Sequence, residues 1–121
     1  MTYPSGTWTQ ANQTGSYGGA VRHASARGAV SRVTFSGSSI AWVSTLASNR
    51  GQAEVWLDGQ RVATVDLFNS ATRTRQVVFS RNSLDPAVTH TLEVRVLGTK
   101  LGKSKGTRVD VDAFVSLPPA G

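Results

Sequence analysis

The sequence contains no cysteine, and this absence removes several kinds of chemistry at once. A chain without thiols forms no disulfide, no thiolate-bound zinc site and no cysteine nucleophile. Histidine is also scarce, since His23 and His90 are the only two among 121 residues. The P-loop, G-x-S-x-G and H-E-x-x-H signatures are missing as well. These absences argue against an enzyme, and we expect a chain that catalyses no reaction of its own.

Long apolar runs are lacking too. No stretch of about 18 apolar residues occurs, so we expect no transmembrane helix and no membrane partner. The first five residues lack the basic start and apolar segment of a signal peptide. The tail from Leu117 to Gly121 contains two adjacent prolines and is typical of a linker. We therefore expect one domain over residues 1–117, excised from a longer protein, with residues 118–121 as a linker remnant.

Acidic residues are few, seven against 13 lysines and arginines, which gives a net charge of +6. A balance this basic suits a polyanionic partner such as nucleic acid, an acidic glycan or a bacterial wall polymer. The arginines are scattered, however, and only Lys100, Lys103 and Lys105 form a cluster. That cluster contains no aromatic residue on which a base could stack. Nucleic acid is therefore not the partner that the sequence favours.

The sequence is rich in strands with apolar residues at every second position. Between residues 52 and 68, this alternation runs on both sides of the pair Asp58-Gly59. A period of two is typical of a half-buried strand. Asp-Gly accepts the positive φ angles of a tight turn. The stretch therefore predicts a β-hairpin that turns at Asp58-Gly59.

Shorter strands are predicted along the rest of the chain, at residues 6–10, 29–35, 40–46, 75–80, 89–97 and 107–117. No stretch shows a helical period. About eight short strands at a spacing of about ten residues predict an all-β protein, a β-sandwich of two antiparallel sheets. The strand 40–46 is apolar on both faces and is expected to be central and covered. Leu92, Val94 and Val96 are predicted to face inward. Val77 and Phe79 are predicted to share one face of their strand, and Val109, Val111, Ala113 and Val115 one face of theirs.

Several segments resemble, in the expected order, galactose-binding-like jelly-roll modules of the carbohydrate-binding type: Gly28–Gly37, Ile40–Trp42, Gly51–Gly59, His90–Val94 and Val109–Val115. Such modules are appended to secreted bacterial glycoside hydrolases, polysaccharide lyases and peptidases. The resemblance implies a jelly roll of two antiparallel sheets that performs no catalysis. It also implies glycan binding, through loops at one end or through a concave sheet face.

The residues that could bind a sugar are aromatic, amide and arginine side chains. An aromatic face packs against the C–H surface of a sugar ring, while arginine and asparagine bind its hydroxyls. Two alternatives stay open, because Trp42 has apolar strand neighbours typical of a core residue and residues 49–51 could form a plain solvated turn. The predicted ligand-binding residues are Tyr17, Trp42, Asn49, Arg50, Trp56, Arg73 and Arg75.

Asp110 and Asp112 stand two residues apart on one predicted strand. Carboxylate oxygens are ligands that calcium accepts. In the modules that this chain resembles, an acidic residue at the position of Asp112 binds structural calcium together with a glutamate from the N-terminal strand. The N-terminal region here offers only amide side chains in place of that glutamate. The alternative to a calcium site is ion pairing with Arg95 or Arg108.

Taken together, these patterns predict a carbohydrate-binding accessory module of a larger, secreted bacterial enzyme. Its expected ligand is a polysaccharide or oligosaccharide, neutral or acidic, and its expected covalent partner is a catalytic domain. The alternative is a structural or adhesion module that binds a protein, or a copy of itself, and no glycan.

Overall fold

The hairpin predicted around Asp58-Gly59 forms one edge of the larger sheet. In the computed structural model, which describes residues 2–117, strand β6 (Gln52–Leu57) pairs antiparallel with β7 (Gln60–Asp66). Asp58 and Gly59 have φ angles of 52° and 82°. Positive φ at both positions gives a turn whose twist matches that of the flanking strands. The predicted hairpin is therefore confirmed.

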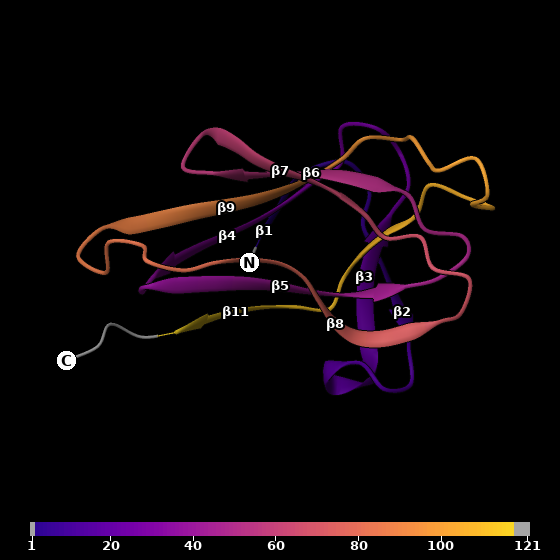
Figure 1. Cartoon of the computed structure of the whole chain (residues 1–121), viewed down its shortest axis with the longest axis horizontal. Coiled ribbons are helices and arrows are strands. Elements are labelled where there is room, and N and C mark those ends of the chain that lie inside the picture. The colour runs from indigo at the N-terminus through magenta and orange to yellow at the C-terminus, as the bar shows by residue number, and fades with distance from the viewer. Residues whose placement is uncertain (1, 118–121) are drawn as a thin grey trace.

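Five antiparallel strands form the first layer of the protein (Figure 1). Leu92, Val94 and Val96 point from this sheet into the core and are at most 1% exposed, as their alternation predicts. Within residues 2–117, helical structure is confined to a short 3-10 turn, and no helix is long and apolar enough to cross a bilayer. The order of strands in the sheet is β1 (Thr2–Ser5), β4 (Val30–Ser36), β9 (Thr89–Val96), β6 and β7.

The second layer consists of two three-stranded sheets. One sheet has the order β11 (Ala113–Leu117), β5 (Ser39–Leu46), β8 (Arg73–Arg81), and the other β10 (Val109–Val111), β3 (Ala20–Ala24), β2 (Thr9–Asn12). Strands β10 and β11 follow each other along the chain but belong to different sheets, so the chain passes from one sheet to the other at Asp112. In Figure 1, β5 and β11 run along the long axis, while β3 crosses them at a steep angle.

The core lies between the two layers and confirms the all-β sandwich of antiparallel sheets. Strand β5 is central in its sheet, as predicted for residues 40–46, and places Ile40 and Trp42 in the core at 2% and 0% exposure. Val55 of β6 and Val109 of β10 meet them from the other sheets, both fully buried. Burial of apolar area on this scale is the main stabilising term of the fold.

The N-terminal segment differs from its prediction of one strand at residues 6–10. The structure has two strands here: β1 ends at Ser5, before the predicted range, and β2 begins at Thr9, inside it. Strand β3 follows and was not predicted. The chain turns at Gly6, where φ is 81° and a Cβ would lie 2.5 Å from the Cβ of Ala29. Only glycine fits there, because any side chain would clash. Strand β3 escaped prediction because its sequence, with Arg22 and His23 in the middle, has no alternating pattern.

A β-bulge in β8 places Val77 and Phe79 on opposite faces of the sheet. Phe79 lies opposite Trp42, but Val77 lies opposite Val43, so β8 advances two residues while β5 advances one. Such an extra residue turns the side chains that follow to the other face. Val77 is consequently 62% exposed, whereas Phe79 packs against the core, so the prediction that the two share one face is wrong.

The single strand predicted at residues 107–117 is divided at Asp112. The Asp112 N–H donates to the carbonyl oxygen of Val43 at 3.0 Å, which holds the chain at the point where it changes sheets. Before this break Val109 and Val111 are buried. After it, Phe114 packs against the core and Val115 is 43% exposed. The prediction that Val115 shares one face with Val109 and Val111 is therefore wrong.

His90 links the hairpin turn to the loop that precedes β9 through two hydrogen bonds. Its ring is 7% exposed, with Nδ1 2.6 Å from the Asp58 carboxylate and Nε2 2.8 Å from the Asp85 carbonyl oxygen. Both partners are acceptors, so the ring satisfies both only when it is doubly protonated. The hydrogen bond to Asp58, and next the one to Asp85, raise the pKa of His90.

This geometry predicts a loss of stability at alkaline pH. A raised pKa in the folded state means that His90 stabilises fully below the unfolded value of about 6.5, and that this contribution disappears as pH rises through the folded pKa. The free energy of unfolding from urea titrations should therefore fall above about pH 6.5, and His90→Asn should remove that fall.

His23→Gln is the matched control. Burial lowers the pKa of His23, so its contribution changes below about pH 6.5 and not above it. The control should leave the alkaline slope unchanged. If the free energy of unfolding of His90→Asn still fell at alkaline pH, His90 would not be the group responsible.

Candidate functional site

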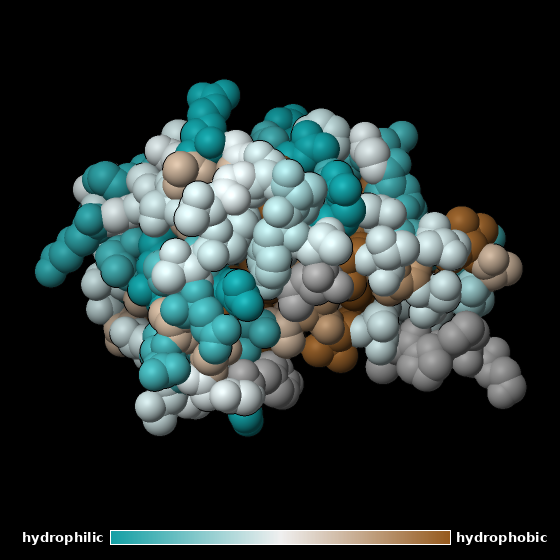
Figure 2. Space-filling model, turned by 180° about the vertical axis from the view of Figure 1, so that it is seen from behind, coloured by the Kyte–Doolittle hydropathy of each residue, from teal (hydrophilic) through white to brown (hydrophobic). Residues whose placement is uncertain are grey.

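Three loops gather at one end of the sandwich, at the right of Figure 1. Residues 47–51 lie between the others, because Ala47 bridges to Phe68 and Arg50 to Arg108. The backbone N–H of Lys105 donates to the Ser48 carbonyl at 2.8 Å, which fixes the third loop. On the reverse side of the molecule, hydrophobic side chains gather mainly in the half away from these loops (Figure 2). This end is the loop rim at which the sequence predicts ligand binding.

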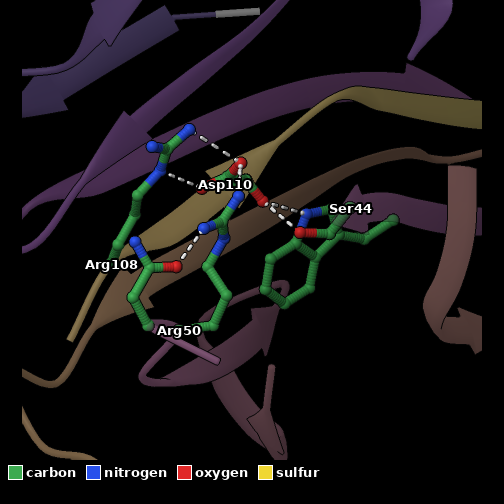
Figure 3. Close-up of polar contacts among 6 residues, drawn as sticks. Ser44, Arg50, Arg108 and Asp110 are labelled. Carbon is green, nitrogen blue, oxygen red and sulfur yellow. Dashed lines mark hydrogen bonds and ion pairs between the residues drawn. The ribbon is translucent and has the colours of Figure 1, made fainter. Parts of the chain in front are cut away.

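Arg50, predicted to contact a ligand at this rim, is instead buried beneath it. Its side chain is 4% exposed, and its Nη2 donates to the Asp110 carboxylate at 2.9 Å (Figure 3). Arg108 donates from Nε to the other carboxylate oxygen at 2.8 Å. Arg50 also donates to the side-chain oxygen of Asn49. Burial lowers the pKa of Arg50, and the Asp110 charge opposes that shift.

Trp42 is also part of this buried cluster. Its indole N–H donates to the backbone carbonyl of Asp110 at 3.2 Å, and the hydroxyl of Ser44 donates to the same oxygen at 2.6 Å. Asp110 thus binds Arg50 and Arg108 through its side chain and the central strand β5 through its carbonyl (Figure 3). With 0% exposure, Trp42 is the core residue that the sequence left as the alternative.

Asp110 does not fit the predicted role of a calcium ligand. Both of its carboxylate oxygens accept hydrogen bonds from guanidinium groups, and two positive charges beside it would repel a cation. Of the two ion pairs that the sequence offered as the alternative, the one with Arg108 is present. Within residues 2–117 no three acidic or histidine side chains are grouped as metal ligands. Asp112, at the break between β10 and β11, stays a prediction.

Trp56 lies elsewhere, on the outer face of the five-stranded sheet. The strand register places Arg32 opposite Glu93, Glu93 opposite Trp56, and Trp56 opposite Arg61. Residues paired in this way point to the same face of a sheet. One row of side chains therefore crosses four strands, from β4 through β9 and β6 to β7.

Hydrogen bonds and stacking link this row into a continuous group. The Arg95 guanidinium lies over the Trp56 ring at 4.0 Å, within the range of a cation–π contact. The Trp56 N–H donates to Glu54 at 3.2 Å, and Arg61 donates to the same carboxylate at 3.1 Å. Glu93 accepts from Arg95 at 2.7 Å and from Arg32 at 2.5 and 2.8 Å. We call this group the Trp56 network: Arg32, Glu54, Trp56, Arg61, Glu93 and Arg95.

In the Trp56 network the carboxylate side chains are less exposed than the guanidinium groups, which extend into solvent. Burial alone would raise the pKa of Glu93, but the hydrogen bonds from Arg95 and Arg32 outweigh burial and lower it. The side chains of Arg61, Arg32 and Arg95 are 60%, 43% and 38% exposed, against 11% for Glu93. The network therefore presents N–H donors around one indole, which suits sugar hydroxyls and carboxylates.

The structure does not gather all the predicted ligand residues into one site. Asn49, Arg73 and Arg75 are exposed, and the loops that carry Asn49 and Arg73 meet where Leu46 pairs with Arg73. Trp56 is four residues along β6 from Gln52, about 13 Å at the usual rise of a strand. The backbone of Tyr17 forms the 3-10 turn η1 (Tyr17–Gly19), and its side chain lies outside the described part of the structure.

Sequence reasoning missed the arginines and glutamates that surround Trp56. Their residue types and outward positions are visible in the strands, and the alternation of residues 89–97 already placed Glu93 and Arg95 on the outer face. What joins them is the register between strands that lie up to 61 residues apart in sequence. That register is a tertiary property, set by the packing of the core on the other face of the sheet.

Asp110→Asn should be the most damaging conservative change in the buried cluster. It leaves two guanidinium groups without their carboxylate, and breaking a buried ion pair in this way costs about 3 kcal/mol. Urea unfolding should show that loss as a lower midpoint with an unchanged slope. Asp66→Asn is the matched control, because its carboxylate is exposed at the end of β7 and accepts from the Phe68 N–H, which an asparagine oxygen can also do; it should cost less than about 1 kcal/mol. Equal losses in the two variants would contradict the assignment.

Comparisons with known proteins give two relatives. No family model matches the sequence. An enzyme of Flavonifractor plautii, described as an A type blood alpha-D-galactosamine galactosaminidase, is 31% identical over 109 residues, which are 90% of this chain and 9% of that protein. The structure of a Paenibacillus xanthan lyase superposes with a TM-score of 0.69 at 17% identity, over 99% of this chain and 12% of that chain.

Both relatives are carbohydrate-active enzymes, and this chain spans only about a tenth of the length of either. At 17% identity the lyase shows the fold alone. The chain is therefore an all-β sandwich that resembles a small part of much larger carbohydrate-active proteins.

Proposed function

We propose that this chain is a non-catalytic, carbohydrate-binding accessory module of a larger enzyme. The observation that carries the proposal is that nearly the whole chain, but only 9% and 12% of the relatives, is matched in two carbohydrate-active enzymes. A segment shared as one folded unit by a galactosaminidase and a lyase is better explained by a common attachment than by a common reaction. The scarcity of histidine and the absence of cysteine support this view.

The Trp56 network is the surface that supports glycan binding best. It combines an aromatic ring with three exposed guanidinium groups, which are held by glutamates and by the indole rather than free to rotate. Held donors lose little conformational freedom on binding. A sugar can lie across the row with its hydroxyls or carboxylate toward the arginines and its apolar face toward the indole edge. Asn49, Arg73 and Arg75 offer further contacts at the loop rim.

The proposed setting is a secreted bacterial enzyme that acts on an insoluble or long-chain polysaccharide. A module of this kind keeps the catalytic domain close to its polymer by raising its effective concentration there. The net charge of +6 strengthens binding to an acidic polymer at low ionic strength. Residues 118–121 as part of a linker belong to the same proposal.

Affinity electrophoresis through gels that contain polysaccharide tests the proposal. We expect retention by xanthan, the acidic representative, or by a neutral galactan, and Trp56→Ala should weaken the binding about tenfold. Arg81→Met is the control for Arg61→Met, since Arg81 has the same charge but lies at the far end of β8, outside the network. Arg61→Met should weaken retention, and the control should not. Arg50→Ala is unsuitable, because it would test the buried cluster instead.

Ionic strength separates specific binding from general attraction. Retention by a neutral polymer should be almost insensitive to salt, because no polymer charge is screened. Retention by an acidic polymer should weaken with salt and still depend on Trp56. A domain that no polysaccharide retains, or that is retained equally well in Trp56→Ala, would contradict the proposal.

A protein-interaction role is the second candidate, and the outer face of β11, β5 and β8 favours it. Val43 lies opposite Val77 and Ala113, and Ala41 lies opposite Val115, so one apolar face spans the sheet. Val77 and Val115 are 62% and 43% exposed there. Exposed apolar patches of this kind mark contact surfaces between proteins.

Self-association is the outcome that the second candidate predicts. The elution volume in size-exclusion chromatography should then fall as protein concentration rises, and Val77→Arg should restore the volume of the monomer. An elution volume that is independent of concentration would remove this candidate for a second copy of the chain.

A further inference from the structure

A hollow of about 290 Å³ opens beside the core, away from the Trp56 network. It lies where β1, β2 and β3 meet the turn η1 and the end of β10. Tyr3 packs against the core from the inner side of the sandwich, whereas Trp56 lies on the outer face of the same sheet. The residues that line the hollow are Tyr3, Gln10, Gly18, Ala20, Val21, Arg22, Val111 and Asp112.

The strand register explains why polar and apolar groups meet there. Gln10 lies opposite Arg22 across β2 and β3, and Arg22 lies opposite Val111 across β3 and β10. The three side chains thus share one face of their sheet. Val111 is 2% exposed and forms an apolar floor, while Gln10 and Arg22 are exposed at the sides. A Cβ at Gly18 would meet no atom within 4 Å, so this wall leaves open space.

Arg22 and Gln10 have hydrogen-bonding capacity to spare. The Arg22 guanidinium lies over the Tyr3 ring at 5.6 Å and forms no ion pair within residues 2–117. The amide of Gln10 forms no hydrogen bond in the same part of the chain. Asp112 adds a carboxylate to the lining. The hollow therefore contains donors and acceptors around an apolar floor, and its one positive and one negative group balance.

We infer that this hollow is a binding site for a single neutral sugar ring. Its volume is just below that of most ligand pockets, which measure about 300–1,000 Å³, and suits one ring rather than a chain. A sugar ring has an apolar face for Val111 and hydroxyls for Arg22, Gln10 and Asp112. An ion is disfavoured, because an anion would face Asp112 and a cation would face Arg22.

This inference rests on the proposed function, since it supplies a second glycan contact on the same module. Two separate contacts would let the module bind two sugar units, or two chains, with a gain in avidity over either contact alone.

An NMR titration of the whole chain tests the site, with methyl α-D-galactopyranoside as the neutral probe. Backbone amide shifts at Gln10, Arg22 and Val111 should change saturably, with a Kd of about 1 mM or weaker, as is usual for one ring with few contacts. Arg22→Met keeps the alkyl stem but removes the donors, and should weaken binding about tenfold. Ala20→Leu, which fills the hollow, should abolish it. Arg81→Met is the control and should bind like the unchanged chain.

The outcomes distinguish this inference from the proposed function. Polysaccharide retention together with amide shifts only around Trp56, or equal shifts in Arg22→Met, would overturn the inferred sugar site in the hollow. Either result would still agree with the proposed function. Shifts at the hollow with calcium chloride alone would overturn it in favour of a cation site. The spectrum of each variant also shows whether that variant is folded, so loss of binding is not confused with loss of structure.

Discussion

The attachment of the loop rim to the sandwich depends on one buried carboxylate, that of Asp110. It has no exposed surface, yet it accepts hydrogen bonds from Arg50 below the loop rim and from Arg108 on its own strand. Its backbone carbonyl accepts from Trp42 and Ser44 of the central strand β5. Because a buried charge without partners is very costly, these contacts stabilise the loop, the last strands and β5 against one another. This constraint fixes the loop rim on the sandwich and leaves Arg50 no freedom to bind a ligand.

Ion pairs on the outer face of the five-stranded sheet leave their arginines exposed, unlike the buried pair of Arg50 with Asp110. There the carboxylates of Glu54 and Glu93 are the less exposed partners, and the arginines above them keep a large part of their surface in water. Their charges are compensated but their outer N–H groups remain available. Arginine that is paired from below is thus held in place for a ligand above. The contrast between Arg50 and Arg61 shows that residue type alone does not separate a buried structural arginine from one whose N–H groups reach solvent.

The comparisons show how large a part of the known proteins this chain matches. Nearly the whole chain is matched, but it spans only about a tenth of each of the two carbohydrate-active enzymes. A sandwich suits the proposed role of an attached module, because its core is complete between the two layers and its outer faces are free to vary. The Trp56 network and the hollow at Arg22 lie on different surfaces of such a unit, so each can change without disturbing the other.

The sequence by itself determined the class of the fold and much of its inner face. Alternation with a period of two fixed the hairpin at Asp58-Gly59 and the burial of Leu92, Val94 and Val96, because a strand shows its two faces locally. Only the tertiary structure decided the rest. A bulge in β8 turned Val77 outward, and the change of sheet at Asp112 exposed Val115. The partners of Asp110 and of Trp56 lie far away in sequence, and long-range register, which local patterns do not encode, brings them together.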